Sequence, residues 1–187
     1  MDDAFATLNL ERRLNLDPDA VECAWRQLSR ELHPDADTGD AERAVAVNRA
    51  YQILRSPGQR LRHWLELHGV TLSRQAAVDP AMMDFFTEVG GLLAQADDVL
   101  KRRAAASSAL AKALLAEAEI VAQQQLQALL GKLQRERTAV TDRFADFEIA
   151  AAESQNFDQA LAATGKLGFF EKWERQVQER LMNLIAG

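Results

Sequence analysis

The sequence predicts an all-α protein. All four prolines lie within the first 80 residues, and the 107 residues that follow contain 22 alanines and no proline. Proline interrupts helices, whereas alanine is the strongest helix former. The chain also lacks the sustained period-two alternation of apolar residues and the Asn-Gly or Asp-Gly turns that are typical of β-hairpins. We therefore expect short helices up to residue 80 and long helices after it.

A helical hairpin is predicted near the N-terminus. Its first helix starts at Asp17-Pro18, because aspartate caps free backbone N–H groups and proline suits the first helical position. It stops near Leu32, because Pro34 keeps the residue before it away from helical angles. The second helix begins near residue 40 or 41 and ends at Ser56-Pro57-Gly58. The apolar stripes of the two helices are Val21, Trp25, Leu28 and Leu32, and then Val47, Tyr51 and Leu54.

Two helices of similar length joined by a short loop pack antiparallel. The hairpin therefore presents His33-Pro34-Asp35 at an exposed tip, with Phe5 and Leu8 covering its apolar seam. A short apolar segment at residues 61–67 follows, and residues 70–79 are typical of a linker. We accordingly expect one domain at residues 1–69 and a second at residues 80–187.

The second domain is predicted to be an elongated bundle of about three helices. A strongly apolar helix starts at Pro80, and one very long helix follows it. The heptad-like stripe of that long helix is Leu126, Leu130, Leu133, Val140, Phe144 and Phe147. Asn156-Phe157-Asp158-Gln159 resembles a capping box and opens the last helix. The stripe of the last helix is Leu167, Phe170, Trp173, Val177, Leu181 and Leu184.

The composition excludes several classes of protein. The net charge is −6, which argues against a general binder of nucleic acid or of anionic membranes. No uncharged apolar run approaches the roughly 20 residues of a membrane helix. The acidic start, Met1-Asp2-Asp3, is unlike a signal peptide. Cys23 is the single cysteine, so no intramolecular disulfide and no cysteine-based metal site is expected. A cytoplasmic setting is the default.

The sequence contains no constellation that points to catalysis. We find no Ser/His/Asp array, no phosphate-binding loop and no nucleotide-binding fingerprint. We therefore expect no catalytic residue, no cofactor and no metal, and we expect that the protein is not an enzyme.

Residues 3–58 resemble a J-domain. The resemblance rests on residues 3–8, on residues 26–35 with their His-Pro-Asp signature, and on residues 48–57. Beyond them, residues 65–69 and 166–172 are similar to the iron–sulfur co-chaperone family HscB. That family joins a J-domain to a three-helix C-terminal bundle, so the resemblance implies the architecture that the periodicity predicts.

The resemblance implies that the protein docks on a DnaK/HscA-type chaperone and stimulates its ATP hydrolysis. Asp35 would accept charge-assisted hydrogen bonds, Pro34 would fix the loop and His33 would contribute to the same contact. Arg26 and Arg30 would form the basic face of the helix that meets the chaperone. This chain has Leu32 and Ala36 where family members often carry tyrosine and lysine, and Glu22 and Glu31 lie near the two arginines.

The resemblance also implies a client, the cluster scaffold protein IscU. Met83, Phe86 and Phe169 match the apolar client contacts of the family. Core packing is the competing interpretation for the large apolar residues near position 83. We expect Phe170 to pack in the core and Phe169 to lie at its edge. The family's repeated glutamates are replaced by Thr87, Gly90 and Gly91, with Asp84 and Glu88 remaining.

Two alternatives stay open. One is a J-domain protein of the same architecture with a different client, which the altered acidic patch favours. The other is a helical scaffold or oligomerisation module whose J-domain is inactive. The sequence does not specify the oligomeric state or which chaperone is the partner.

Overall fold

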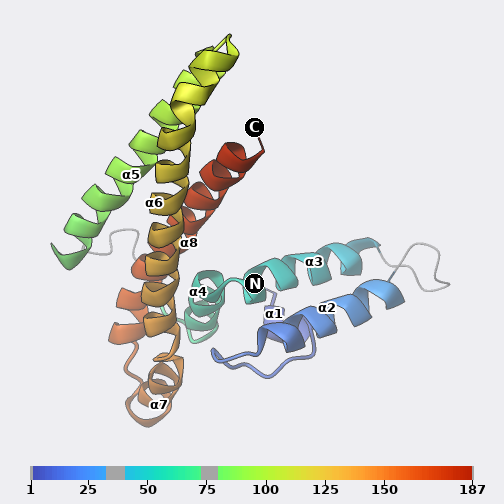
Figure 1. The fold of residues 1–187 in the computed structure, drawn as a ribbon. Helices are drawn as coiled ribbons and strands as arrows, with labels where there is room; N and C mark the ends of the chain where they lie inside the picture. Colours follow the sequence, from blue (N-terminus) through green and yellow to red (C-terminus); the bar gives the residue numbers. More distant parts are fainter. Residues whose placement is uncertain (1, 33–40, 73–79, 187) are drawn as a thin grey trace. The chain divides into compact units, whose positions relative to one another are not determined.

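The computed structural model describes residues 2–32, 41–72 and 80–186, and it confirms the all-α class. Eight helices and no strand occur within these ranges (Figure 1). Their bounds are α1 Ala4–Thr7, α2 Pro18–Glu31, α3 Ala41–Arg55, α4 Pro57–Leu67, α5 Pro80–Ala105, α6 Ala109–Thr141, α7 Phe144–Ser154 and α8 Asp158–Ile185. None of the helices in this part of the chain has the length and apolar character needed to cross a membrane.

The chain forms two compact units. Unit 1 comprises Met1–Gln75 and Val140–Gly168, and unit 2 comprises Ala76–Ala139 and Phe169–Gly187. Residues of α6 and of α8 therefore belong to both units. The sequence predicts two separate domains with boundaries near residues 69 and 80, and this division stays a prediction.

The helical hairpin of unit 1 follows the local sequence signals. The Asp17 carboxylate accepts a hydrogen bond from the Asp19 N–H at 3.0 Å, and Pro18 occupies the first turn of α2. α2 packs on α3, and α1 and α4 also pack on α3. Ser56 caps α4 by accepting from the Gln59 N–H at 3.1 Å, so the proline that ends α3 also starts α4. Gly69 then turns the chain with a φ of +74°, a conformation that favours glycine.

The core of unit 1 combines residues that are far apart in sequence. Phe5, Leu8 and Leu14 are almost fully buried, together with side chains of α2, α3 and α4. The later part of the chain supplies Phe144, Phe147, Ala151, Ala160, Ala163 and Leu167. The Leu14 N–H donates to Glu148 Oε1 at 2.6 Å, which ties the loop before α2 to α7. Unit 1 is thus closed by α7 and by the first turns of α8.

The expectation of one very long helix through Phe147 was wrong. α6 ends at Thr141, and α7 starts at Phe144 after a turn in which the Arg143 N–H donates to the Val140 carbonyl at 3.2 Å. No proline or glycine marks this break. Phe144 and Phe147 are buried in the core of unit 1, so tertiary packing overrides the helical periodicity that continues through them.

Unit 2 is an elongated bundle of α5, α6 and the later part of α8. Its buried residues recur at spacings of three and four, as in heptad packing. They are Met82, Phe85, Val89, Leu93, Ala96 and Val99 on α5, Leu115, Ala122, Leu126, Leu129 and Leu133 on α6, and Phe170, Trp173, Val177, Leu181 and Leu184 on α8. α5 continues through Gly90 and Gly91 without interruption.

We predict that Phe144→Ala lowers the free energy of unfolding by about 3–5 kcal/mol, because it opens a cavity in a closed core. Ile149→Ala on the same helix is the control, since Ile149 is exposed and its truncation costs little. Urea denaturation followed by circular dichroism measures both. Equal and small effects of the two substitutions would show that α7 is not part of the core of unit 1.

Candidate functional site

The predicted tip residues His33, Pro34 and Asp35 lie outside the described residues. The structure describes the chain on both sides of them. α2 ends at Glu31 and is capped by Leu32, which is buried and whose N–H donates to the Leu28 carbonyl at 3.0 Å. α3 starts at Ala41. The two helices that bracket the tip are therefore both anchored in unit 1.

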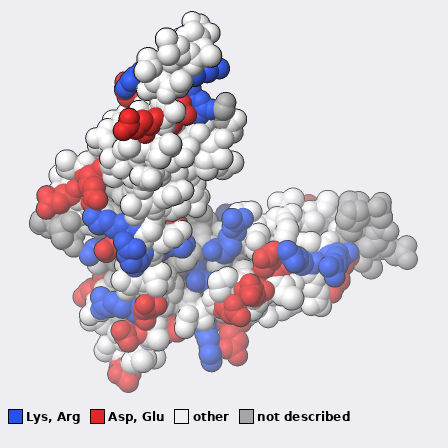
Figure 2. Space-filling view, viewed as in Figure 1, with Lys and Arg blue, Asp and Glu red and all other residues white. Residues whose placement is uncertain are grey.

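The two arginines predicted for the basic face of α2 differ in their surroundings. Arg26 Nη2 lies 2.5 Å from Glu22 Oε1, one helical turn away, so its charge is compensated locally. Arg30 has no ion-pair or hydrogen-bond partner among the residues that the structure describes, and it is exposed. Space-filling representation shows acidic and basic side chains interspersed along unit 1 (Figure 2). Arg30 is thus the more available of the two charges.

An aromatic contact fixes the register of α2 on α3. The rings of Trp25 and Tyr51 stack with centroids 4.5 Å apart and an interplanar angle of 16°. Trp25 Nε1 donates to Asn48 Oδ1 at 2.8 Å, which satisfies the indole N–H at the surface. The Arg55 guanidinium lies over the Tyr51 ring, 5.5 Å from its centroid. Offset aromatic pairs of this kind contribute about 0.5–1.5 kcal/mol beyond area burial, and this pair resists sliding of one helix along the other.

The three residues predicted to contact a client meet on one side of unit 2. Phe86 of α5 and Phe169 of α8 are both half-buried, and their rings pack edge to face with centroids 4.8 Å apart. Trp173 lies behind them, 4.6 Å from Phe86 and 5.7 Å from Phe169 between centroids. Met83, one turn before Phe86 on α5, is 56% exposed. We call Met83, Phe86 and Phe169 the aromatic surface.

Phe85 and Phe170 form a second, buried layer beneath this surface. Phe170 is 2% exposed, as the stripe through Trp173 predicts, and it contacts Phe85 edge to face at 6.0 Å. Adjacent residues on a helix point about 100° apart, which explains how Phe169 and Phe170 divide between surface and core. The same division holds for Phe85 and Phe86 on α5.

Two carboxylates near the aromatic surface are paired within the chain, whereas Asp84, next to Met83 on α5, is exposed and has no ion-pair partner among the described residues. Lys132 of α6 pairs with Glu88 of α5, and its ammonium lies 4.7 Å from the centroid of the Phe85 ring. Arg137 pairs with Glu174 at 3.1 Å. Burial raises the pKa of Glu174, although the Arg137 charge acts in the opposite direction. The carboxylate of Glu88 is therefore already compensated by a cation of the same unit.

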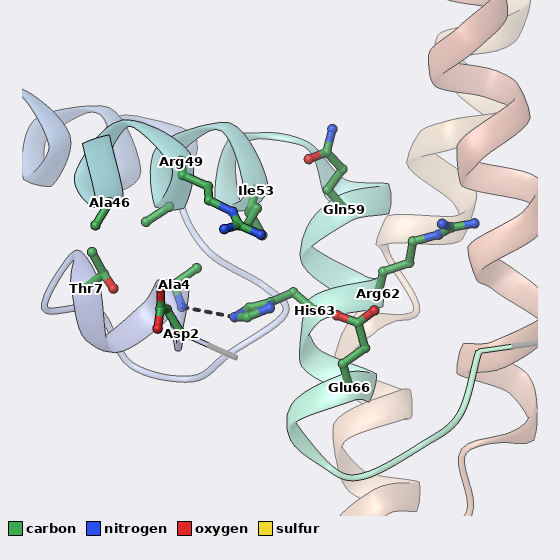
Figure 3. A pocket seen from close by; sticks show the side chains of 11 residues that line it. Asp2, Ala4, Thr7, Ala46, Arg49, Ile53, Gln59, Arg62, His63 and Glu66 are labelled. Atoms are coloured by element: carbon green, nitrogen blue, oxygen red, sulfur yellow. Dashed lines mark hydrogen bonds between the residues drawn. The ribbon is translucent and has the colours of Figure 1, made fainter. Parts of the chain in front are cut away.

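Unit 1 also contains a pocket of about 440 Å³ between α1, α3 and α4, which sequence reasoning missed (Figure 3). α3 and α4 each line it with residues spaced at three and four. The lining residues are Asp2, Ala4, Thr7, Ala46, Arg49, Ala50, Ile53, Gln59, Arg62, His63 and Glu66. Its charged residues are two arginines and two carboxylates, so the pocket does not favour one sign of ligand.

His63 on the wall of this pocket has a structural role. It is 4% exposed, its ring stacks on Phe5, and its Nε2 accepts a hydrogen bond from the Ala4 N–H at 3.0 Å. The ring therefore holds the first turn of α1, as Figure 3 shows. Burial lowers the pKa of His63, and Arg12 and Arg49 add to this effect, while Asp3 and Glu66 oppose it. A neutral imidazole is required, because only an unprotonated Nε2 can accept this bond.

The ranges that the structure describes contain no group of three or more His, Cys, Asp or Glu side chains placed to hold a metal ion. Cys23 is exposed and free. The predicted site residues that the structure describes are thus two arginines on α2 and the methionine and two phenylalanines of the aromatic surface.

Comparisons with known proteins agree on one family. The DnaJ domain matches residues 3–63. The co-chaperone protein HscB homolog of Bordetella pertussis is 37% identical over 139 residues, which cover 69% of this chain and 79% of that protein. The homolog from Chromobacterium violaceum is 38% identical over 76 residues, covering 36% of this chain and 43% of that protein.

Two solved structures share the fold. Human co-chaperone protein HscB matches with a TM-score of 0.64 and 20% identity, covering 96% of this chain and 82% of that one. Chaperone HscB from Vibrio cholerae matches with a TM-score of 0.54 and 24% identity, covering 95% of this chain and 96% of that one. At these identities the likeness concerns the fold alone.

We predict that the free energy of unfolding falls as the pH is lowered from about 7 toward 5. The pKa of His63 in the folded state lies below the ordinary value of 6.5, so the unfolded chain takes up its proton first. The stabilisation is fully present above that ordinary value and is lost as the pH falls below it. His63→Gln should reduce this pH dependence, whereas the control His68→Gln, at an exposed histidine, should retain it. Urea titrations at several pH values decide, and equal pH slopes for both variants would contradict the assignment.

Proposed function

Because the chain belongs to the family of HscB co-chaperones, we propose that it stimulates the ATPase of a DnaK/HscA-type chaperone through His33, Pro34 and Asp35 and delivers a client protein in iron–sulfur cluster assembly. The observation that carries the proposal is the match to an HscB homolog along 79% of that protein's length. The helical hairpin supports it, because it brackets the His-Pro-Asp loop with two anchored helices. In this role the protein acts by binding and carries out no covalent chemistry of its own, in a cytoplasmic setting.

The chaperone contact rests on charge and loop shape. The Asp35 carboxylate accepts charge-assisted hydrogen bonds from a chaperone arginine, which are roughly twice as strong as neutral ones. Arg30, exposed and unpaired among the described residues, steers the encounter with an acidic chaperone surface. Arg26 contributes less, because Glu22 already compensates its charge.

We propose that the aromatic surface binds the client, an IscU-like scaffold. Exposed methionine and phenylalanine side chains make an adaptable apolar binding surface. The edge-to-face pair of Phe86 and Phe169 is held by Trp173, so it is ordered before the client arrives. Preorganisation of this kind reduces the entropy lost on binding.

A second candidate is a J-domain protein of the same architecture with a different client. The pairing of Glu88 with Lys132 favours it, because a compensated carboxylate attracts a basic client surface only weakly. Binding measurements against an IscU-like scaffold at rising salt separate the two. Affinity that is high and insensitive to salt fits an apolar contact with the scaffold, whereas no binding supports the different client.

We predict that Asp35→Asn abolishes ATPase stimulation and leaves the melting temperature unchanged, because a loop carboxylate contributes little to the core. Steady-state ATP hydrolysis by a purified DnaK/HscA-type chaperone, with and without the variant, measures this. Asp37→Asn is the matched control, since it removes one carboxylate from the same loop and should retain stimulation. Stimulation by Asp35→Asn at the wild-type level would contradict ATPase stimulation through Asp35. It would favour a helical scaffold with an inactive J-domain.

We predict that Phe170→Ala and Phe169→Ala separate stability from client binding. Phe170→Ala should cost about 3–5 kcal/mol of unfolding free energy, because it empties a buried site. Phe169→Ala should cost clearly less and should weaken binding of the scaffold. Met83→Ala should weaken binding without a change in melting temperature, and Met182→Ala, at a still more exposed methionine of the same unit, should change neither. If Phe169→Ala destabilises more than Phe170→Ala, Phe169 is a core residue and the client surface is misassigned.

A further inference from the structure

The pocket between α1, α3 and α4 is lined on one side by alanine side chains. Ala4 and Ala50 are almost fully buried, and Ala46 lies one turn before Ala50 on α3. Because an alanine side chain ends at a single methyl group, the helices leave a space there that larger residues would fill. The volume of about 440 Å³ falls within the roughly 300–1,000 Å³ that is typical of small-molecule sites. The pocket is therefore large enough for a small organic molecule.

His63 contributes a buried hydrogen-bond donor to the wall of this pocket. Its Nε2 accepts from the Ala4 N–H, so the neutral ring carries its proton on Nδ1. No residue in the described ranges accepts a hydrogen bond from this Nδ1–H, although the side chain is only 5% exposed. A buried donor without a partner costs free energy until another group supplies the acceptor. An acceptor on a bound ligand would supply it.

Four charged side chains line the pocket without an ion-pair partner among the described residues. They are Asp2, Arg49, Arg62 and Glu66, and all four are exposed. Glu66 follows His63 by three positions on α4, and in Figure 3 the Arg49 side chain extends from α3 toward the side where His63 lies. Burial lowers the pKa of His63, Glu66 raises it and Arg49 lowers it further, which places both charges near the ring. An unpaired cation and an unpaired anion thus lie close to a buried donor.

These charges select the class of ligand. An anion is attracted by the two arginines and repelled by the two carboxylates, and a cation meets the reverse conflict. An uncharged molecule would displace water from these groups without replacing its hydrogen bonds. A molecule that carries both signs is attracted by both pairs of groups in one orientation. The donors of an arginine and of the His63 ring suit a carboxylate as its anionic end.

We propose that this pocket binds an α-amino acid with an aliphatic side chain. The ligand carboxylate accepts hydrogen bonds from the Arg49 guanidinium and from the Nδ1–H of His63. The ligand ammonium donates to the Glu66 carboxylate, and the ligand side chain packs on Ala46 and Ala50. Each of these protein groups then has a complementary partner, and no covalent bond of the ligand is made or broken.

Binding at this site is weak and stabilises unit 1. The charged side chains stay in contact with water, which limits the strength of each ion pair, so we expect a dissociation constant of about 1 mM or more. A ligand that binds only the folded chain raises the melting temperature as its concentration rises. Neither Arg26 and Arg30 nor the aromatic surface contributes a residue to the lining of this pocket. Amino-acid binding and ATPase stimulation are therefore separate properties, and either one is testable without the other.

Titration of the isotopically labelled intact chain with L-leucine near neutral pH, followed by NMR, tests the proposal. The expected result is a saturable shift of the amide signals of the pocket residues, with half-saturation in the millimolar range. N-acetyl-leucine lacks the cationic end of leucine, and leucinamide lacks the anionic end. Each analogue should bind about fivefold more weakly than leucine or worse, because each carries a single charge that one pair of pocket residues repels.

Arg49→Gln and Glu66→Gln should each weaken leucine binding by about fivefold or more. Arg43→Gln is the matched control, since it removes an exposed arginine of α3 that does not line the pocket, and it should bind leucine like the wild type. Circular dichroism checks folding, and Arg49→Lys, which loses the forked geometry, replaces Arg49→Gln if that variant is unfolded. Absence of a saturable shift up to roughly 50 mM leucine overturns the proposal. So does equal binding of leucine and both analogues, or binding that neither pocket substitution weakens.

Discussion

The burial of α7 and the first turns of α8 among the N-terminal helices is the constraint on which the rest of unit 1 depends. Phe144 and Phe147 are packed with Phe5, Leu8 and Leu14 in one apolar cluster, although more than a hundred residues separate them in sequence. The hydrogen bond from Leu14 to Glu148 fixes this contact at the surface. Because the core is closed in this way, α3 packs on a buried base, and α2 is held on α3 by Trp25 and Tyr51. The two helices that flank the His-Pro-Asp loop in sequence are thus supported by that core.

The aromatic surface of unit 2 depends on how adjacent side chains are divided between the core and the exterior. Neighbouring phenylalanines on α5 and on α8 divide their roles, with Phe85 and Phe170 buried and Phe86 and Phe169 facing outward. Trp173 contacts both layers, so the outward pair is supported by the core. The cation of Lys132 lies over Phe85 and compensates Glu88. The surface is consequently mainly apolar, and Asp84 beside it is the exposed carboxylate that no cation among the described residues compensates.

Much of the fold could be predicted from the sequence, because its signals are local. Asp17-Pro18 and the stripe through Leu28 specify α2 at the level of single turns, and the buried stripe of α8 through Phe170 and Trp173 follows from periodicity alone. The break between α6 and α7 could not be predicted, since no proline or glycine marks it and the apolar spacing continues across it. The hydrogen bond between Ala4 and His63 could not be predicted either. The partners are 59 positions apart, and the sequence around a single histidine does not indicate which residue will contact it. The residues predicted for the aromatic surface do come together, whereas their client stays a prediction. The role of the His-Pro-Asp loop also stays a prediction, because its residues lie outside the described ranges.

The shared core has a consequence for how this protein can be divided. The ring of Trp64 on α4 lies 5.8 Å from that of Phe157, and His68 lies 5.5 Å from the same ring, so the segment between α7 and α8 shields the end of α4. A fragment that stopped after α4 would expose this aromatic face and the pocket vacated by Phe144 to water. The N-terminal helices α1–α4 thus cannot be fused to another protein without losing part of their core. A chimera or a minimal fragment of this protein therefore has to include α7 and the beginning of α8 together with the N-terminal helices.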